Sequence, residues 1–176
     1  MSDSVKDNIS GLTDSIVESY AADAHTQRVG LTYMPSRSRI VEIVTLARQL
    51  LFPGYFGQKK LTHENVRFNV GNLLMRLSEG LIEQITHCLC VNGPYQNDDA
   101  CRAKAETLTL EFLRRVAKIR EMLILDAQAA YDGDPAAKNI EEVVYCYPGY
   151  HAVTVYRVAH ELHELGVPLM PRIMTE

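Results

Sequence analysis

The sequence predicts an all-α protein, a multi-helix bundle in which one helix is much longer than the others. Along most of the 176 residues, apolar side chains recur every three or four positions, the spacing of one helix face. Proline and glycine separate these segments, and strand-type alternation is scarce. Apolar residues make up 47% and charged residues 23% of the chain, which is typical of a folded domain with a sizeable core.

Two helices are predicted before residue 53. An amphipathic segment over residues 5–27 ends before Gly30. A second helix over residues 38–52 opens after Pro35 and stops at Pro53, because proline cannot continue the helical hydrogen bonds. Its apolar positions have helical spacing: Ile40, Ile43, Val44, Ala47 and Leu51.

A third helix is predicted to begin after Thr62. Threonine is a good N-cap, and we expect the helix to reach about Val91. Gly93 suits the left-handed conformation in which many helices end. The apolar stripe of this helix consists of Val66, Val70, Leu73, Leu77, Leu81 and Ile85.

The fourth predicted helix is the longest, because no glycine or proline interrupts the chain between Pro94 and Gly133. Over residues 98–131 it would span about 50 Å at 1.5 Å per residue. That length exceeds the diameter of a domain of this size, so we expect part of the helix to pack against another subunit. The alternative is a long helix packed within one bundle. Its stripe consists of Ala105, Leu108, Phe112, Val116, Ile119, Leu123, Ala127 and Ala130.

Turns and shorter helices are predicted after residue 131. Asp132-Gly133-Asp134-Pro135 is a turn sequence, and Asn139 followed by Glu142 matches an N-capping pattern. A helix follows over residues 150–165, and a last helical segment covers 169–175. We therefore divide the chain into an α-helical oligomerisation bundle, residues 1–131, and a region of short helices, residues 132–176.

Composition argues against several classes of function. The net charge is −4 and no basic stripe is present, which argues against nucleic-acid binding. No apolar run approaches the roughly 18 residues that a membrane span needs. The first residues lack the apolar core of a signal peptide, so we expect a cytoplasmic protein without a membrane partner.

The cysteines and histidines do not predict a metal site. On a helix, Cys88 and Cys90 would lie about 200° apart, so they would not share one ion. We expect all four cysteines to be free thiols. His160 and His163 are three residues apart, whereas the zinc motif His-Glu-x-x-His needs a spacing of four, so we expect surface or interface histidines.

Asp134 and Arg157 are the two polar residues with alternative interpretations. Asp134 either forms the turn that stops the long helix or presents its carboxylate to the ammonium group of a substrate. Arg157 is either a solvated charge or an anchor for a carboxylate or a helix end. The residues alone favour a structural role for both.

With these residues in view, the chain resembles the helical region that precedes the catalytic domain of bacterial serine O-acetyltransferases. The match is strong over residues 131–176 and weaker over 36–130. Four motifs carry the resemblance, in order along the chain: Asp134-Pro135-Ala136, Gly149-Tyr150-His151-Ala152, Tyr156-Arg157 and Ala159-His160.

The resemblance implies transfer of an acetyl group from acetyl-CoA to the hydroxyl of L-serine, the first committed step of cysteine synthesis. A histidine in a left-handed parallel β-helix would act as the general base, and no cofactor besides the co-substrate acetyl-CoA is implied. Asp134 matches the position that binds the serine ammonium group. The family also implies a homo-oligomer, trimer or hexamer, and a C-terminal tail that engages O-acetylserine sulfhydrylase.

The chain stops at Glu176, where the family would begin its β-helix. From this we expect a truncated piece of the enzyme that has neither the catalytic histidine nor the acetyl-CoA site and no serine acetylation activity by itself. One alternative is a stand-alone helical oligomerisation or interaction module without catalysis. Another is a related hexapeptide acyltransferase with a different acceptor.

Overall fold

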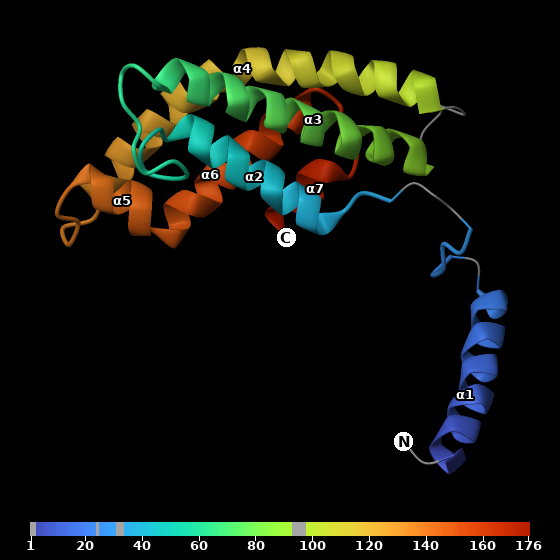
Figure 1. The fold of residues 1–176 in the computed structure, drawn as a ribbon. Helices are drawn as coiled ribbons and strands as arrows, with labels where there is room; N and C mark the ends of the chain where they lie inside the picture. Colours follow the sequence, from blue (N-terminus) through green and yellow to red (C-terminus); the bar gives the residue numbers. More distant parts are fainter. Residues whose placement is uncertain (1–2, 24, 31–33, 93–97) are drawn as a thin grey trace. The chain divides into compact units, whose positions relative to one another are not determined.

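The computed structural model of the chain describes residues 3–23, 25–30, 34–92 and 98–176. The chain divides into two compact units, residues 1–32 and 33–176, which are described separately. The described residues form α-helices and no β-strand, so the predicted all-α class is confirmed. The helices are labelled in Figure 1: α1 (Asp3–Ala22), α2 (Arg37–Leu51), α3 (Val66–Asn92), α4 (Asp98–Gly133), α5 (Ile140–Cys146), α6 (Pro148–Glu164) and α7 (Met170–Thr175).

The first unit contains the amphipathic helix α1. This helix ends at Ala22, whereas the sequence pattern predicts an end near residue 27. The reason is local, because the Asp23 carboxylate accepts a hydrogen bond from the backbone N–H of His25 at 2.7 Å and turns the chain. The hydrogen bond to this N–H is the first cause of the lowered pKa of Asp23.

In the second unit, α2 begins at a capped residue and lies against α3. The Ser36 hydroxyl accepts the backbone N–H of Arg39 at 3.4 Å, and the Ser36 N–H donates to Oε1 of the buried Gln84 at 2.7 Å. A Cβ added to Gly80 would lie 3.1 Å from the Ile43 side chain, so this glycine lets the two helices approach closely. The predicted apolar face of α2 is buried, with Val44 half-buried.

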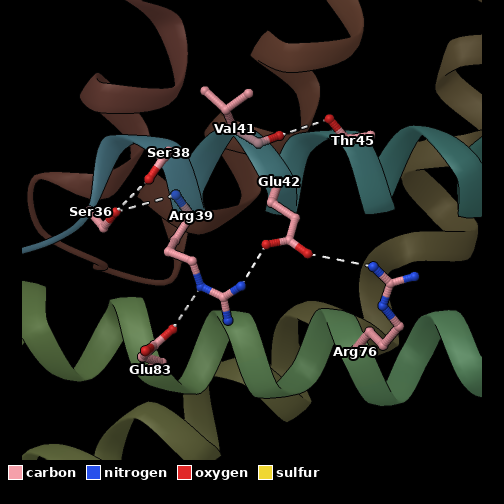
Figure 2. A network of polar contacts seen from close by, with 8 residues as sticks. All are labelled: Ser36, Ser38, Arg39, Val41, Glu42, Thr45, Arg76 and Glu83. Atoms are coloured by element: carbon pink, nitrogen blue, oxygen red, sulfur yellow. Dashed lines mark hydrogen bonds and ion pairs between the residues drawn. The ribbon is translucent and has the colours of Figure 1, made fainter.

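Figure 2 shows the ion pairs that join the outer faces of α2 and α3. Arg39 pairs with Glu42 on its own helix and with Glu83 on α3, the latter at 3.2 Å. Arg76 on α3 pairs with Glu42 at 3.5 Å. These side chains are about half exposed, so water screens the pairs and they contribute little to stability. The apolar contacts therefore hold α2 on α3.

Helices α3 and α4 lie side by side and contribute much of the core (Figure 1). The capping bond predicted for Thr62 is present, since its hydroxyl accepts the N–H of Asn65 at 3.3 Å one turn before α3 begins. The predicted end of α3 at Gly93 lies outside the described residues. Both predicted stripes contribute buried residues: Leu73, Leu77, Leu81 and Ile85 from α3, and Ala105, Leu108, Phe112, Ile119, Leu123 and Ala127 from α4.

A disulfide joins Cys90 to Cys101, so the expectation of four free thiols is wrong. The expectation is based on Cys88 and Cys90, which lie on one helix, whereas the disulfide joins the end of α3 to the beginning of α4. Because the two helices lie side by side, the Cα atoms are 6.1 Å apart, a separation that a disulfide spans. Cys88 and Cys146 are free, and burial raises the pKa of the Cys88 thiol to about 11.

Helix α4 has 36 residues and spans about 54 Å. It contacts α2, α3, α5 and α6, so neighbouring helices of the same unit bury its predicted stripe. Leu110, Ile124 and Leu125 on α4 are exposed within the chain. Contact between this helix and another subunit stays a prediction.

Helices α5, α6 and α7 complete the second unit. The Asn139 side chain accepts the N–H of Glu142 at 2.8 Å, which confirms the predicted cap of α5. Helix α6 begins at Pro148, two residues earlier than predicted, because the first helical position needs no N–H. It ends at Glu164, and Gly166 follows the cap residue Leu165 with a φ of 77°, the left-handed conformation that glycine adopts readily. The division of the chain at residue 131 stays a prediction.

Candidate functional site

The candidate site is the turn after α4, which contains Asp134. The backbone N–H of Asp134 donates to the Tyr131 carbonyl at 3.4 Å, and its own carbonyl accepts the N–H of Ala137 at 3.1 Å. The Asp134 Oδ1 atom accepts the N–H of Ala136 at 2.9 Å across Pro135. Asp134 therefore forms the turn that ends the long helix, as its structural interpretation predicts.

Tyr147 makes the second contact with the Asp134 carboxylate. Its hydroxyl donates to Oδ2 at 2.7 Å. Tyr147 is the residue between α5 and α6, where it follows the last residue of one helix and precedes the first of the next. Each carboxylate oxygen thus has a hydrogen-bond donor. The sequence pattern does not single out Tyr147, whose only signal is its place directly before Pro148.

These two contacts determine the protonation of the pair. The Tyr147 hydroxyl, followed by the Ala136 N–H, lowers the pKa of Asp134 below its ordinary value of 3.8. In return, the Asp134 carboxylate is the first cause that raises the pKa of Tyr147 to about 12. At neutral pH the site therefore presents an ionised carboxylate and a protonated phenol.

The other motif residues of α6 bind this helix to α4. Arg157 donates two hydrogen bonds to Asp126, both at 2.9 Å, which confirms its interpretation as an anchor for a carboxylate. The buried Tyr150 donates its hydroxyl to the Leu123 carbonyl at 2.8 Å. These contacts hold α6 against α4. The turn of Asp134 directly follows α4.

The histidines of α6 have separate surroundings. Burial is the first cause that lowers the pKa of His151, and the positive charge of Arg48 is the second. The His160 ring stacks on Tyr156, with ring centres 5.6 Å apart. In the described part of the chain, no group of three or more histidine, cysteine, aspartate or glutamate side chains is placed to hold a metal ion.

Length and polarity of the helices bear on membrane contact. Among the residues that the structure describes, no helix combines the length and the apolar character that crossing a membrane requires.

Comparison with known proteins shows that the chain is similar to serine acetyltransferases. Residues 76–155 match the family described as serine acetyltransferase, N-terminal. A plasmid-encoded serine acetyltransferase of Synechococcus elongatus is 37% identical over 148 residues, which cover 81% of this chain and 46% of that protein. A serine acetyltransferase of Mycobacterium tuberculosis is 47% identical over 51 residues, 29% of this chain and 22% of that protein.

Solved structures give the same result. The structure of serine acetyltransferase 1 from Entamoeba histolytica in complex with L-cysteine matches with a TM-score of 0.62 and 26% identity. The match covers 98% of this chain and 58% of that one.

The chain spans about half the length of the plasmid-encoded relative, 46% of it. The residues that match the family model, 76–155, include α4, α5, the turn of Asp134 and the beginning of the anchored helix α6. The chain resembles serine acetyltransferases, and residues 76–155 match the N-terminal region of that family.

Proposed function

We propose that this chain is part of an enzyme that transfers the acetyl group of acetyl-CoA to L-serine in cysteine synthesis. In this reaction the serine hydroxyl oxygen bonds to the thioester carbonyl carbon, the carbon–sulfur bond breaks, and the hydroxyl proton passes through a general base to the departing thiolate. The residues of this chain supply no general base in the proposal. Acetyl-CoA is a co-substrate, and no cofactor is required.

Within that enzyme, Asp134 would form one edge of the serine site. The observation that carries this proposal is the ionised Asp134 carboxylate, whose partner in the fold is an uncharged hydroxyl. An ammonium group supplies the opposite charge and three N–H donors, so it suits such a carboxylate. The hydroxyl that reacts would then lie at the opposite end of the same small substrate.

The test is Asp134→Asn in an active acetyltransferase that contains this chain. The KM for serine is expected to rise at least about 30-fold, because a charged hydrogen bond to the substrate is lost. The KM for acetyl-CoA is expected to stay within about twofold, since acetyl-CoA carries no ammonium group for Asp134 to bind. Equal losses for both substrates would instead assign Asp134 to folding alone. The 176-residue chain by itself is expected to release no CoA in a serine-dependent manner.

The proposal includes a homo-oligomer, trimer or hexamer, formed through the helices. Exposed apolar side chains on two long helices support it: Phe68 and Met75 on α3, and Leu110, Ile124 and Leu125 on α4. Sedimentation of the purified chain as a monomer at micromolar concentration would contradict it. O-Acetylserine sulfhydrylase as a partner rests on the family resemblance alone.

A cytoplasmic location is the last part of the proposal. It is supported by the substrates of the family, which belong to central metabolism. The Cys90–Cys101 disulfide is unusual for that compartment, where thiols are kept reduced. Trapping the thiols of the protein in intact cells would show whether the pair is reduced there.

A further inference from the structure

We propose that Tyr147 is a positioning residue for the amino group of the substrate, acting through the orientation of the Asp134 carboxylate. This inference rests on the proposed function, in which Asp134 binds an ammonium group. It adds a residue that lies thirteen positions further along the chain and contributes one hydroxyl to the site.

The two oxygens of Asp134 are fixed by different parts of the fold. Oδ1 accepts the backbone N–H of Ala136 in the turn, and Oδ2 accepts the hydroxyl of Tyr147. With the turn contact alone, the carboxylate would keep one restrained oxygen and one free to move. The second contact determines the plane of the group. An ionised carboxylate has about four acceptor positions, so about two remain for a ligand.

Tyr147 is held firmly enough to do this. Its backbone N–H donates to the Val143 carbonyl at 3.3 Å, and its carbonyl accepts the N–H of His151 at 3.1 Å. Its backbone is extended because Pro148 follows it, and a residue before proline favours this conformation. The phenol thus projects from the junction of two helices, and its side chain is half-buried.

The Tyr147 hydroxyl acts as a donor and keeps its proton. The hydrogen bond to Asp134 is the first cause that raises its pKa to about 12, and burial is the second. The charges of Asp134, and of Glu142 and Cys146 on α5, act in the same direction. On α4, the nearby Asp132 accepts a hydrogen bond from the Gln128 side chain at 2.8 Å. A hydroxyl orients Asp134 without cancelling its charge, whereas a lysine or arginine in its place would occupy the carboxylate with an ion pair.

A purely structural role for this hydroxyl is the competing explanation. The contact ties the turn after α4 to the α5–α6 junction. However, α5 and α6 also pack on α4 through other contacts, among them the two hydrogen bonds between Arg157 and Asp126. Removing one hydroxyl therefore leaves these helices in place, and the effect on Asp134 can be measured in a folded chain.

The experiment compares Tyr147→Phe with Tyr145→Phe as a matched control. Tyr145 lies two residues earlier, and its exposed ring stacks on Phe56 at 5.7 Å. Carboxyl ¹³C NMR of the 176-residue chain measures the Asp134 pKa directly. We expect this pKa to rise in Tyr147→Phe and to stay unchanged in Tyr145→Phe. An Asp134 pKa that is the same in Tyr147→Phe as in the unsubstituted chain overturns the inference.

Kinetics of an active acetyltransferase that contains this chain provide the second readout. Tyr147→Phe is expected to raise the KM for serine about tenfold, with the KM for acetyl-CoA unchanged. The acid limb of the serine pH profile is expected to move to higher pH, because Asp134 is then protonated at higher pH.

The variant Asp134→Asn, measured alongside, separates the role of Tyr147 from the proposed serine site at Asp134. If Asp134→Asn raises the KM for serine and Tyr147→Phe does not, the inference about Tyr147 is overturned and the proposed function stands. If neither variant raises it, the proposed serine site at Asp134 is overturned as well. Circular dichroism of Tyr147→Phe confirms that the helices are intact.

Discussion

Two aspartates, one within α4 and one just after it, are held by residues of α6 and of its N-terminal junction, but by groups of different charge. Asp126 accepts two hydrogen bonds from the Arg157 guanidinium, both at 2.9 Å. Asp134 accepts the uncharged hydroxyl of Tyr147 at 2.7 Å. The guanidinium neutralises Asp126, whereas the hydroxyl leaves the charge of Asp134 uncompensated. The first contact therefore serves packing, and the second keeps a carboxylate available to a cation.

A third carboxylate, Glu161, extends this comparison to a more deeply buried position and should give the largest effect on stability. Its side chain is 10% exposed and pairs with Arg115 of α4 at 2.9 Å. Arg115→Met should lower the free energy of unfolding by about 3 kcal/mol, because it leaves a buried charge without a partner. Urea denaturation measures this loss.

The matched control for Arg115 is Arg102, which pairs with Glu106 on the exposed face of α4, where the side chains are 68% and 53% exposed. Arg102→Met should change the free energy of unfolding by less than about 0.5 kcal/mol. Similar losses in both variants would show that burial does not decide the contribution of these pairs.

Removing Arg157 should have a smaller effect than removing Arg115. Asp126 and Arg157 are about one quarter exposed, so water partly compensates the lost contact. Arg157→Met should cost about 2 kcal/mol, the contribution of hydrogen bonds to a charged group. Tyr147→Phe should cost less than Arg157→Met, because it removes a single hydrogen bond from an uncharged donor. If the tyrosine variant were the less stable of the two by urea denaturation, the contrast between a packing contact and a positioning contact would be wrong.

The smallest effect concerns pH. Because the folded pKa of Asp134 lies below its ordinary value, the contribution of the Tyr147 contact is fully present above about pH 4 and is lost as pH falls through the folded pKa. The difference in urea midpoint between the unsubstituted chain and Tyr147→Phe should therefore be constant from pH 5 to pH 7 and shrink towards pH 3. A difference that grows on acidification would contradict this sign.

The helices were predictable because their signals are local. Apolar spacing predicts the buried faces of α2, α3 and α4, and the caps at Thr62 and Asn139 are present. Each of these signals acts within one or two helical turns. The end of α1 was misplaced because the turn at Asp23 depends on one polar side chain, and apolar spacing carries no information on that contact.

Two features of the site and core were not predictable from such signals. The Cys90–Cys101 bond joins different helices, and the Asp134–Tyr147 contact joins a turn to a helix junction. Both depend on how helices pack, which apolar spacing describes only as a buried face. Asp134 itself was found through its motif, with no information on what would hold its carboxylate.

By itself, the sequence determined the helical class, the order of the helices, the faces they bury and the resemblance that pointed to serine acetyltransferases. These follow from spacing and short motifs, which are properties of neighbouring residues. Only the tertiary structure decided which partner each carboxylate received: a cation for Asp126 and Glu161, and a neutral hydroxyl for Asp134. The physical reason is that a partner is selected by distance in space, and packing brings together residues that the chain keeps apart.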